Sequence, residues 1–209
     1  MDNKLIEFLD RKVREFNQPQ FIINDPISVP HRFSDKQDRE IAGFFAAIFS
    51  WGNRKTIINK ANELMRLMDD APYAFCLNHS EQERKKLLHF KHRTFNTTDL
   101  LYFLDFLQQH YKKYDSLEWA FASGISKQDT TIENGLKAFH RNFFSLDLVP
   151  ARTIKHISTP DRKSTCKRLN MFLRWMVRKD NKGVDFGIWK KIKPAQLVIP
   201  VDVHVARVS

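Results

Sequence analysis

The chain of 209 residues has little of what marks disulfide-bonded, metal-binding or membrane-spanning proteins. Its two cysteines, Cys76 and Cys166, have no metal-ligand spacing and imply no disulfide framework. Uninterrupted apolar runs stay short of the roughly 20 residues that a membrane span needs, so no membrane partner is expected. Period-two alternation, internal repeats and low-complexity tracts are also lacking. These absences favour a soluble, cytoplasmic protein without a β-sheet.

What the chain has in excess is positive charge. Lysine and arginine number 35 against 24 acidic residues, which gives a formal net charge of +11 and an isoelectric point of about 9.7. Such an excess favours a polyanionic partner, nucleic acid first and an anionic membrane second, although it also serves solubility alone. The hydrophobic content of 42% is enough to bury a core, arranged as one domain or as two small lobes.

Apolar residues recur at helical spacing along most of the chain, which predicts an all-α fold. Ser34 and Gln37 predict a capping box before a helix over residues 41–50. That segment is apolar on nearly all sides, so the helix is expected at the centre of the fold. The polar turn at Trp51–Arg54 ends it. Further helices are expected over residues 5–16, 57–67, 81–89, 99–112, 116–122, 132–143 and 169–177.

A single carboxylate, Asp202, lies in an apolar stretch near the end of the chain. An aspartate that follows a proline and precedes a helical pattern is a natural N-cap, and capping alone is one interpretation. The segment Pro-Val-Asp202-Val-His204-Val also resembles the motif that closes the active site of helix-hairpin-helix DNA glycosylases, especially the branch that excises oxidised guanine. The aspartate is catalytic in that family, so the resemblance implies the same role for Asp202.

A second motif, Ser164-Thr-Cys-Lys167-Arg168, opens the helix predicted over 169–177. It is similar to the start of the second hairpin helix in the glycosylases that also cleave the strand. There a lysine amine attacks the sugar carbon that carries the damaged base and forms an imine, while the aspartate stabilises positive charge on the sugar. The resemblance implies that Lys167 is the nucleophile, and an ordinary surface lysine is the alternative. Typical members have glycines in the hairpin, where this chain has Asp161–Thr165.

Two other segments are similar to the same family. Glu40–Ser50 with the following Trp-Gly-Asn53-Arg54 matches a buried helix and its loop, from which a polar side chain fills the gap left by the extruded base. Asn53 is the matching residue, with Arg54 beside it, and a simple turn residue is the alternative. Phe90–Phe95 is similar to the family's Tyr-Arg loop, and its basic residues interleaved with aromatics suit a phosphate and base contact. A solvated loop with buried phenylalanines is the alternative.

Nucleic-acid contacts are therefore expected from His92-Arg93 and from the basic segment Arg152–Arg168. The candidate nucleic-acid-binding residues are Asn53, Arg54, His92, Arg93, Arg162, Lys163, Ser164, Arg168 and His204. The four-cysteine iron–sulfur site of one glycosylase branch has no counterpart here, so neither a metal nor an organic cofactor is expected.

As a whole the chain most resembles an uncharacterised bacterial family of unknown function that is related to these glycosylases. Trp-Gly-Asn-Arg, Cys-Lys-Arg-Leu-Asn, Leu-Arg-Trp-Met-Val-Arg and Pro-Val-Asp-Val-His-Val recur in it, and the likeness covers nearly the full chain. It implies one two-lobed helical domain over 1–209, with one lobe around 34–145 and the other formed by 1–33 with 146–209. Further C-terminal helices are expected beyond residue 209.

The leading functional hypothesis is a monomeric base-excision repair glycosylase, with or without strand-cleaving lyase activity, that acts on a damaged base such as an oxidised purine in duplex DNA. Lys167 and Asp202 are its predicted catalytic residues. One alternative is a non-catalytic module of the same fold that binds DNA or RNA. Another is an adaptor whose basic face docks an acidic protein.

Overall fold

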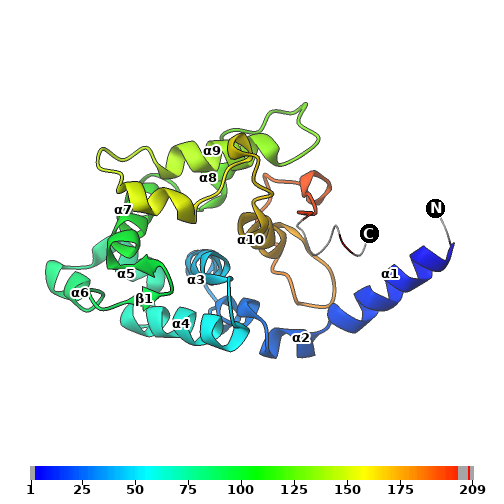
Figure 1. The fold of residues 1–209 in the computed structure, drawn as a ribbon, viewed down its shortest axis with the longest axis horizontal. Coiled ribbons are helices and arrows are strands. Elements are labelled where there is room, and N and C mark those ends of the chain that lie inside the picture. Colours follow the sequence, from blue (N-terminus) through cyan, green and yellow to red (C-terminus); the bar gives the residue numbers. More distant parts are fainter. Residues whose placement is uncertain (1–2, 202–206, 208–209) are drawn as a thin grey trace.

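The computed structural model describes residues 3–201 and residue 207, and helices make up most of this part of the chain (Figure 1). The α-helices are α1 (Asn3–Phe16), α2 (Pro19–Ile23), α3 (Lys36–Phe49), α4 (Arg54–Leu67), α5 (Pro72–Asn78), α6 (Glu81–Lys85), α7 (Thr97–Lys113), α8 (Glu118–Ala122), α9 (Glu133–Phe143) and α10 (Lys167–Val177). Short 3-10 helices are η1 (Pro26–Ser28), η2 (Pro30–Arg32), η3 (Ala151–His156), η4 (Pro160–Arg162) and η5 (Pro194–Gln196). The predominance of helices confirms the predicted all-α class.

One small sheet is present, so the prediction that the chain has no sheet is wrong. Strand β1 (Lys91–His92) pairs antiparallel with β2 (Phe95–Asn96). Each strand holds two residues, which is too short for alternation of polar and apolar residues to be recognised in the sequence. The hairpin's importance lies in its turn, which holds Arg93 at the surface.

Helix α3 is the central helix of the fold, as its sequence predicts. Every residue from Glu40 to Phe49 is buried. The predicted Ser34–Gln37 capping box is wrong: the helix begins at Lys36, and the Gln37 side chain instead donates a hydrogen bond to the Asp115 carbonyl. A tertiary partner has therefore replaced the local one.

Phenylalanine rings from four helices pack around Phe44 of α3. Its ring centroid lies 5.6 Å from that of Phe103 in α7 and 5.7 Å from those of Phe139 in α9 and Phe172 in α10. The closely packed rings join α3 to α7, α9 and α10. Buried residues from 27–33, 41–143 and 157–192 belong to one hydrophobic cluster. The division into lobes at 34–145 remains a prediction.

Glu40 is a buried carboxylate in the middle of this core. It accepts hydrogen bonds from the Tyr111 hydroxyl (2.8 Å), the Ser116 hydroxyl (2.5 Å), the Leu117 amide (2.9 Å) and the Trp189 indole (2.6 Å). Burial raises the pKa of Glu40, and these donors oppose that rise because they stabilise the charged form. Glu40 thus joins α3 to α7, to the start of α8 and to the segment before η5.

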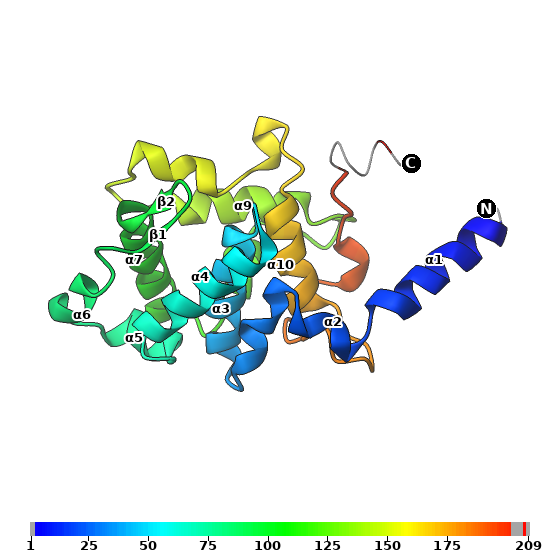
Figure 2. The same cartoon turned by 60° about the horizontal axis from the view of Figure 1, so that its bottom comes forward.

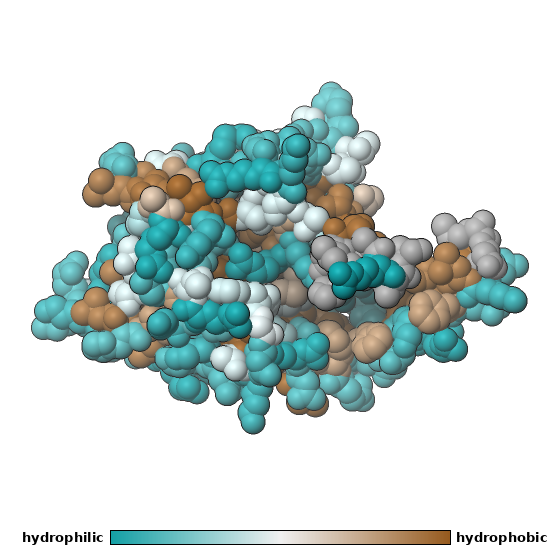
Figure 3. Space-filling model, viewed as in Figure 1, coloured by the Kyte–Doolittle hydropathy of each residue, from teal (hydrophilic) through white to brown (hydrophobic). Residues whose placement is uncertain are grey.

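Helix α1 is amphipathic as predicted, yet none of its side chains is buried. Leu5, Ile6, Phe8, Leu9, Val13 and Phe16 are 40–53% exposed. Figures 1 and 2 show α1 extending away from the rest of the molecule, and Figure 3 shows its apolar residues at the surface on the same side. Its helical periodicity was sufficient to predict the element but not its packing. Among the described helices, none is both long and apolar enough to cross a membrane.

Five histidines predict how stability depends on pH. Burial lowers the pKa of His31, His92, His110, His140 and His156 below the ordinary value of 6.5. The unfolded chain therefore binds protons before the folded chain does, and stability is lost as the pH falls through the unfolded pKa. Urea unfolding is expected to show a free energy that rises between about pH 6 and 7.5, by up to about 1.4 kcal/mol per pH unit for each histidine. A flat profile in this window would contradict the burial of neutral histidines.

Candidate nucleic-acid interface

Four segments that lie far apart in the sequence meet at one surface. They are the turn between α3 and α4, the hairpin turn, η3 and the start of α10. The Arg152 guanidinium in η3 donates to the Thr94 carbonyl of the hairpin turn at 2.8 Å. The Arg168 guanidinium in α10 donates to the Ile48 carbonyl near the end of α3, and to the His156 carbonyl of η3 at 3.1 Å. These bonds hold the four segments together.

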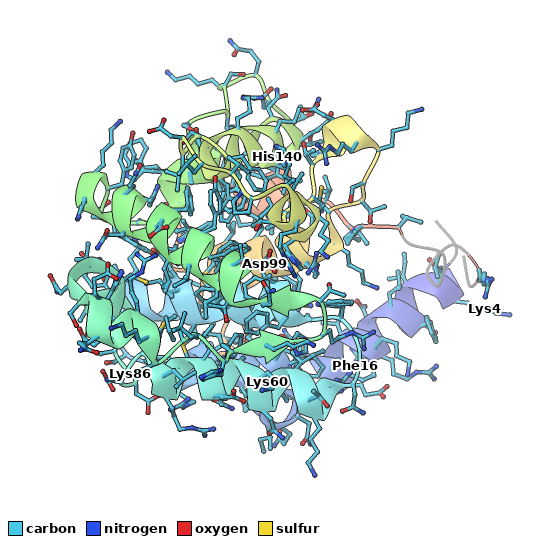
Figure 4. All side chains as sticks on the ribbon, turned by 60° about the vertical axis from the view of Figure 1, so that its left-hand side comes forward. Lys4, Phe16, Lys60, Lys86, Asp99 and His140 are labelled. Atoms are coloured by element: carbon cyan, nitrogen blue, oxygen red, sulfur yellow. The ribbon has the colours of Figure 1, made fainter. Side chains whose placement is uncertain are left out.

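Asp99 organises η3 from below the surface. Its side chain is fully buried, at the first turn of α7, and Figure 4 labels it near the middle of the molecule in that view. It accepts hydrogen bonds from the Asn96 amide, the Thr153 hydroxyl and the Arg152 Nε. The His156 Nε2 lies 3.3 Å from it. Burial raises the pKa of Asp99, but these partners outweigh burial and hold the pKa below its ordinary value.

Arg152 is held in place by this arrangement. Its Nε and Nη2 atoms contact Asp99 at 3.3 and 3.2 Å, and Nη2 also donates to Thr94. The side chain remains 42% exposed. An arginine oriented in this way loses little conformational entropy when it binds an anion, which favours recognition of phosphate.

The exposed cations at this surface form what we call the basic face: Arg54, Arg93, Arg152, Lys155 and Lys167. Arg54 begins α4 directly after the turn that contacts Arg93. Lys155 follows Arg152 at the three-residue spacing that aligns side chains on a 3-10 helix. Lys167 is the first residue of α10, beside Arg168. Each of the four segments therefore contributes at least one residue to the basic face or directly precedes one.

Lys167 occupies the position that the sequence predicts, at the start of a helix and at the surface. The turn before it forms without glycine. Lys163 and Cys166 adopt left-handed backbone conformations, with φ of 56° and 49°, where glycine is the residue of lowest cost. The Cys166 amide donates to the Ser164 hydroxyl at 3.1 Å, so the Ser164 side chain stabilises the turn. Arg162 ends η4 and is exposed, as is Lys163.

Other predicted contact residues have structural roles in the described chain. Asn53 caps α4, accepting a hydrogen bond from the Thr56 amide at 3.2 Å, which agrees with the turn interpretation. His92 is 2% exposed and its Nε2 lies 3.0 Å from the Phe49 carbonyl. The Arg168 guanidinium points inward to two carbonyls, and burial lowers its pKa. Neither His92 nor Arg168 presents its polar atoms to the basic face in this conformation.

Asp202 and His204 lie outside the described residues, so the catalytic role of Asp202 and the nucleic-acid contact of His204 stay predictions. Asp99 was missed by sequence reasoning as an organising residue. The sequence feature that could have revealed Asp99 is its spacing from Asn96, because the two residues form a capping box at the start of α7. Among the residues that the structure describes, no group of three or more His, Cys, Asp or Glu side chains is arranged to hold a metal ion.

Comparison with known proteins identifies a family to which the chain is similar. The profile of a family described as "Protein of unknown function (DUF2400)" matches residues 25–209. Neither a curated protein nor a solved structure matches the chain. Because the family match covers most of the sequence, including every residue of the basic face, the chain belongs to this family of unknown function.

Proposed function

We propose that this protein binds duplex DNA through the basic face and excises a damaged base there, with Lys167 as nucleophile and Asp202 as general base and electrostatic stabiliser. The observation that carries the proposal is the position of Lys167. It stands at the surface on the first turn of α10, at the end of a face whose exposed side chains are cationic. A reactive amine beside a phosphate-binding surface is the arrangement that this chemistry needs.

The proposed reaction begins when the nitrogen lone pair of the Lys167 amine attacks the sugar carbon that carries the base. A nitrogen–carbon bond forms, the glycosidic bond breaks, and the base leaves with the bonding electrons and takes up a proton. The sugar ring then opens: the nitrogen lone pair forms the C=N bond, the bond from the same carbon to the ring oxygen breaks, the ring oxygen takes up a proton and the nitrogen loses one, which gives the imine. The Asp202 carboxylate supports the reaction by stabilising positive charge on the sugar and by accepting a proton.

A second candidate, a nucleic-acid-binding module without catalysis, is favoured by the turn before α10. Lys163 and Cys166 have left-handed backbone conformations although both carry side chains. A glycine in this turn would let the backbone approach a phosphate closely, whereas the exposed Lys163 has a side chain at that place. Binding would then depend on side-chain cations. Such a module binds DNA or RNA by the same face.

Salt dependence of binding tests the interface that both candidates share. Affinity for a short duplex is expected to fall steeply with added salt, because cations on the basic face displace counterions from phosphates. Lys155→Ala and Arg54→Ala are each expected to weaken binding to all sequences alike and to reduce the log–log salt slope by about 1. Fluorescence anisotropy across a salt series measures both quantities.

The matched control is Lys127→Ala, which removes the same charge from the exposed loop between α8 and α9. It is expected to leave the salt slope unchanged. A slope near zero for the wild type, or no binding at low ionic strength, would exclude nucleic acid and leave the adaptor for an acidic protein. Equal effects of Lys127→Ala and Lys155→Ala would place the contact elsewhere on the surface.

A further inference from the structure

Trp51 and Arg93 form a stacked pair within the basic face. The Arg93 guanidinium carbon lies 4.5 Å from the Trp51 ring centroid, and the indole is half-buried. His92 meets the indole edge-on, with ring centroids 6.2 Å apart. The turn after α3 thus supplies the Trp51 ring, and the hairpin residues His92 and Arg93 contact the edge and the face of this ring.

The backbone conformations of Gly52 and Arg93 let the Arg93 side chain lie close to the turn that holds Trp51. Arg93 has a φ of +54°, a left-handed conformation that costs about 1–2 kcal/mol for a residue with a side chain. Gly52 has a φ of +109°, and a Cβ built on it would lie 2.5 Å from the Arg93 Nη1. The positive φ therefore favours glycine at position 52, and a side chain there would push the Arg93 guanidinium from its place over the ring.

The pair also contains an unmet hydrogen-bond donor. The Trp51 Nε1 is buried without a hydrogen-bond partner among the described residues. A buried N–H of this kind is costly and is usually satisfied. It belongs to the ring that the exposed Arg93 guanidinium covers.

We infer that Trp51 and Arg93 form a binding site for an unpaired nucleobase. This inference rests on the proposed function and adds the kind of nucleic acid that the face prefers. The base stacks on the indole face that Arg93 covers, and the guanidinium moves to the phosphate of the same nucleotide. Every base has a flat π-face, so the site selects an unpaired base over a paired one without selecting its identity.

The properties of arginine explain why the site is closed by Arg93 and not by an apolar residue. A guanidinium covers the ring in the free protein by a cation–π contact worth about 0.5–1 kcal/mol at an exposed position. Base stacking on an aromatic side chain contributes about 1–3 kcal/mol, so the base displaces the guanidinium. After it moves, the positively charged Arg93 pairs with the phosphate, whereas an apolar side chain in its place could not.

The test compares two probes that differ in one nucleotide: a fully paired duplex, and the same duplex with a single bulged adenine. The wild type is expected to bind the bulged duplex about tenfold more tightly. Trp51→Leu is expected to abolish this preference while affinity for the paired duplex stays close to that of the wild type. Trp51→Phe keeps a stacking ring and is expected to retain part of the preference.

Arg93→Lys keeps the charge but not the planar group. It is expected to preserve the preference for the bulge and the salt slope, because the base contact belongs to the indole. The control is Trp119→Leu, which removes a 37% exposed tryptophan held under Lys191 outside the basic face. It is expected to leave the preference intact.

Tryptophan fluorescence gives a second readout that does not depend on Trp51→Leu folding. In the Trp119→Phe background, the remaining tryptophans besides Trp51 are Trp175 and Trp189, which are 3% and 2% exposed. The bulged duplex is expected to quench the emission more than the paired duplex does, since a stacked base contacts Trp51 directly. Equal quenching by the two probes would overturn the inference.

The outcomes also separate this inference from the proposed function. Tight, salt-dependent binding of both duplexes without a preference for the bulge overturns the unpaired-base site and leaves duplex binding in place. A preference that survives in a folded Trp51→Leu variant overturns the site as well. Absence of binding to either probe refutes the proposed function, and the inference falls with it.

Discussion

Replacing Glu40 with alanine is expected to lower the free energy of unfolding by about 3–5 kcal/mol. The carboxylate is the common acceptor for Tyr111, Ser116, Leu117 and Trp189 in the core. Its removal leaves these donors buried without an acceptor and opens a cavity beside α3. Urea denaturation followed by circular dichroism measures the change.

Two further variants show that the effect belongs to the buried network. Glu40→Gln keeps one acceptor oxygen but directs an amide at donor groups, so an intermediate loss is expected. Glu63→Ala removes a carboxylate that pairs with Lys60 at the surface of α4, and it is expected to cost at most about 0.5 kcal/mol. Comparable losses for Glu40→Ala and Glu63→Ala would show that the Glu40 bonds do not stabilise the fold.

The second large effect is expected on catalysis. If the protein excises bases as proposed, Lys167→Gln removes the nucleophile and Asp202→Asn removes the charge that stabilises the sugar. Either substitution is expected to reduce base release at a damaged site by orders of magnitude, with little change in duplex affinity, because both groups act in the transition state. Asparagine caps a helix about as well as aspartate, so the thermal midpoint of Asp202→Asn is expected to stay near that of the wild type.

Borohydride trapping on oxidised, alkylated and deaminated duplexes is the direct measurement, since borohydride fixes an imine as a covalent adduct. The matched control is Lys127→Gln, which removes the same charge from the exposed loop between α8 and α9. It is expected to leave trapping unchanged. If the wild type released no base and trapped no imine on any substrate, the catalytic proposal would be rejected and the binding module retained.

Helical periodicity was a sufficient guide wherever a helix presents one continuous apolar stripe to the core. It located α3, α7 and α10, while the place of Lys167 at the start of α10 came from the motif resemblance. The apolar character of residues 41–50 on nearly all sides also predicted the central place of this helix. These features depend on spacing along the chain, which the sequence displays directly.

Periodicity was a poorer guide to short or exposed elements. The hairpin of β1 and β2 escaped detection because each strand has two residues. Helix α1 has a strong apolar stripe of which no residue is buried in the described structure, because periodicity predicts a face but not its partner. Local rules failed at α3 as well, where Gln37 bonds to Asp115 across the fold.

By itself the sequence determined the helical class, the excess of positive charge and the candidates from which an interface is built. Only the tertiary structure decided which candidates face outward. Arg93 lies over Trp51 at the surface, whereas His92, its neighbour in sequence, turns inward to the Phe49 carbonyl. Arg168 likewise turns inward to the Ile48 carbonyl, while Lys167 is exposed. The physical reason is that buried carbonyls need donors, and the donors that reach them come from residues far away in the chain.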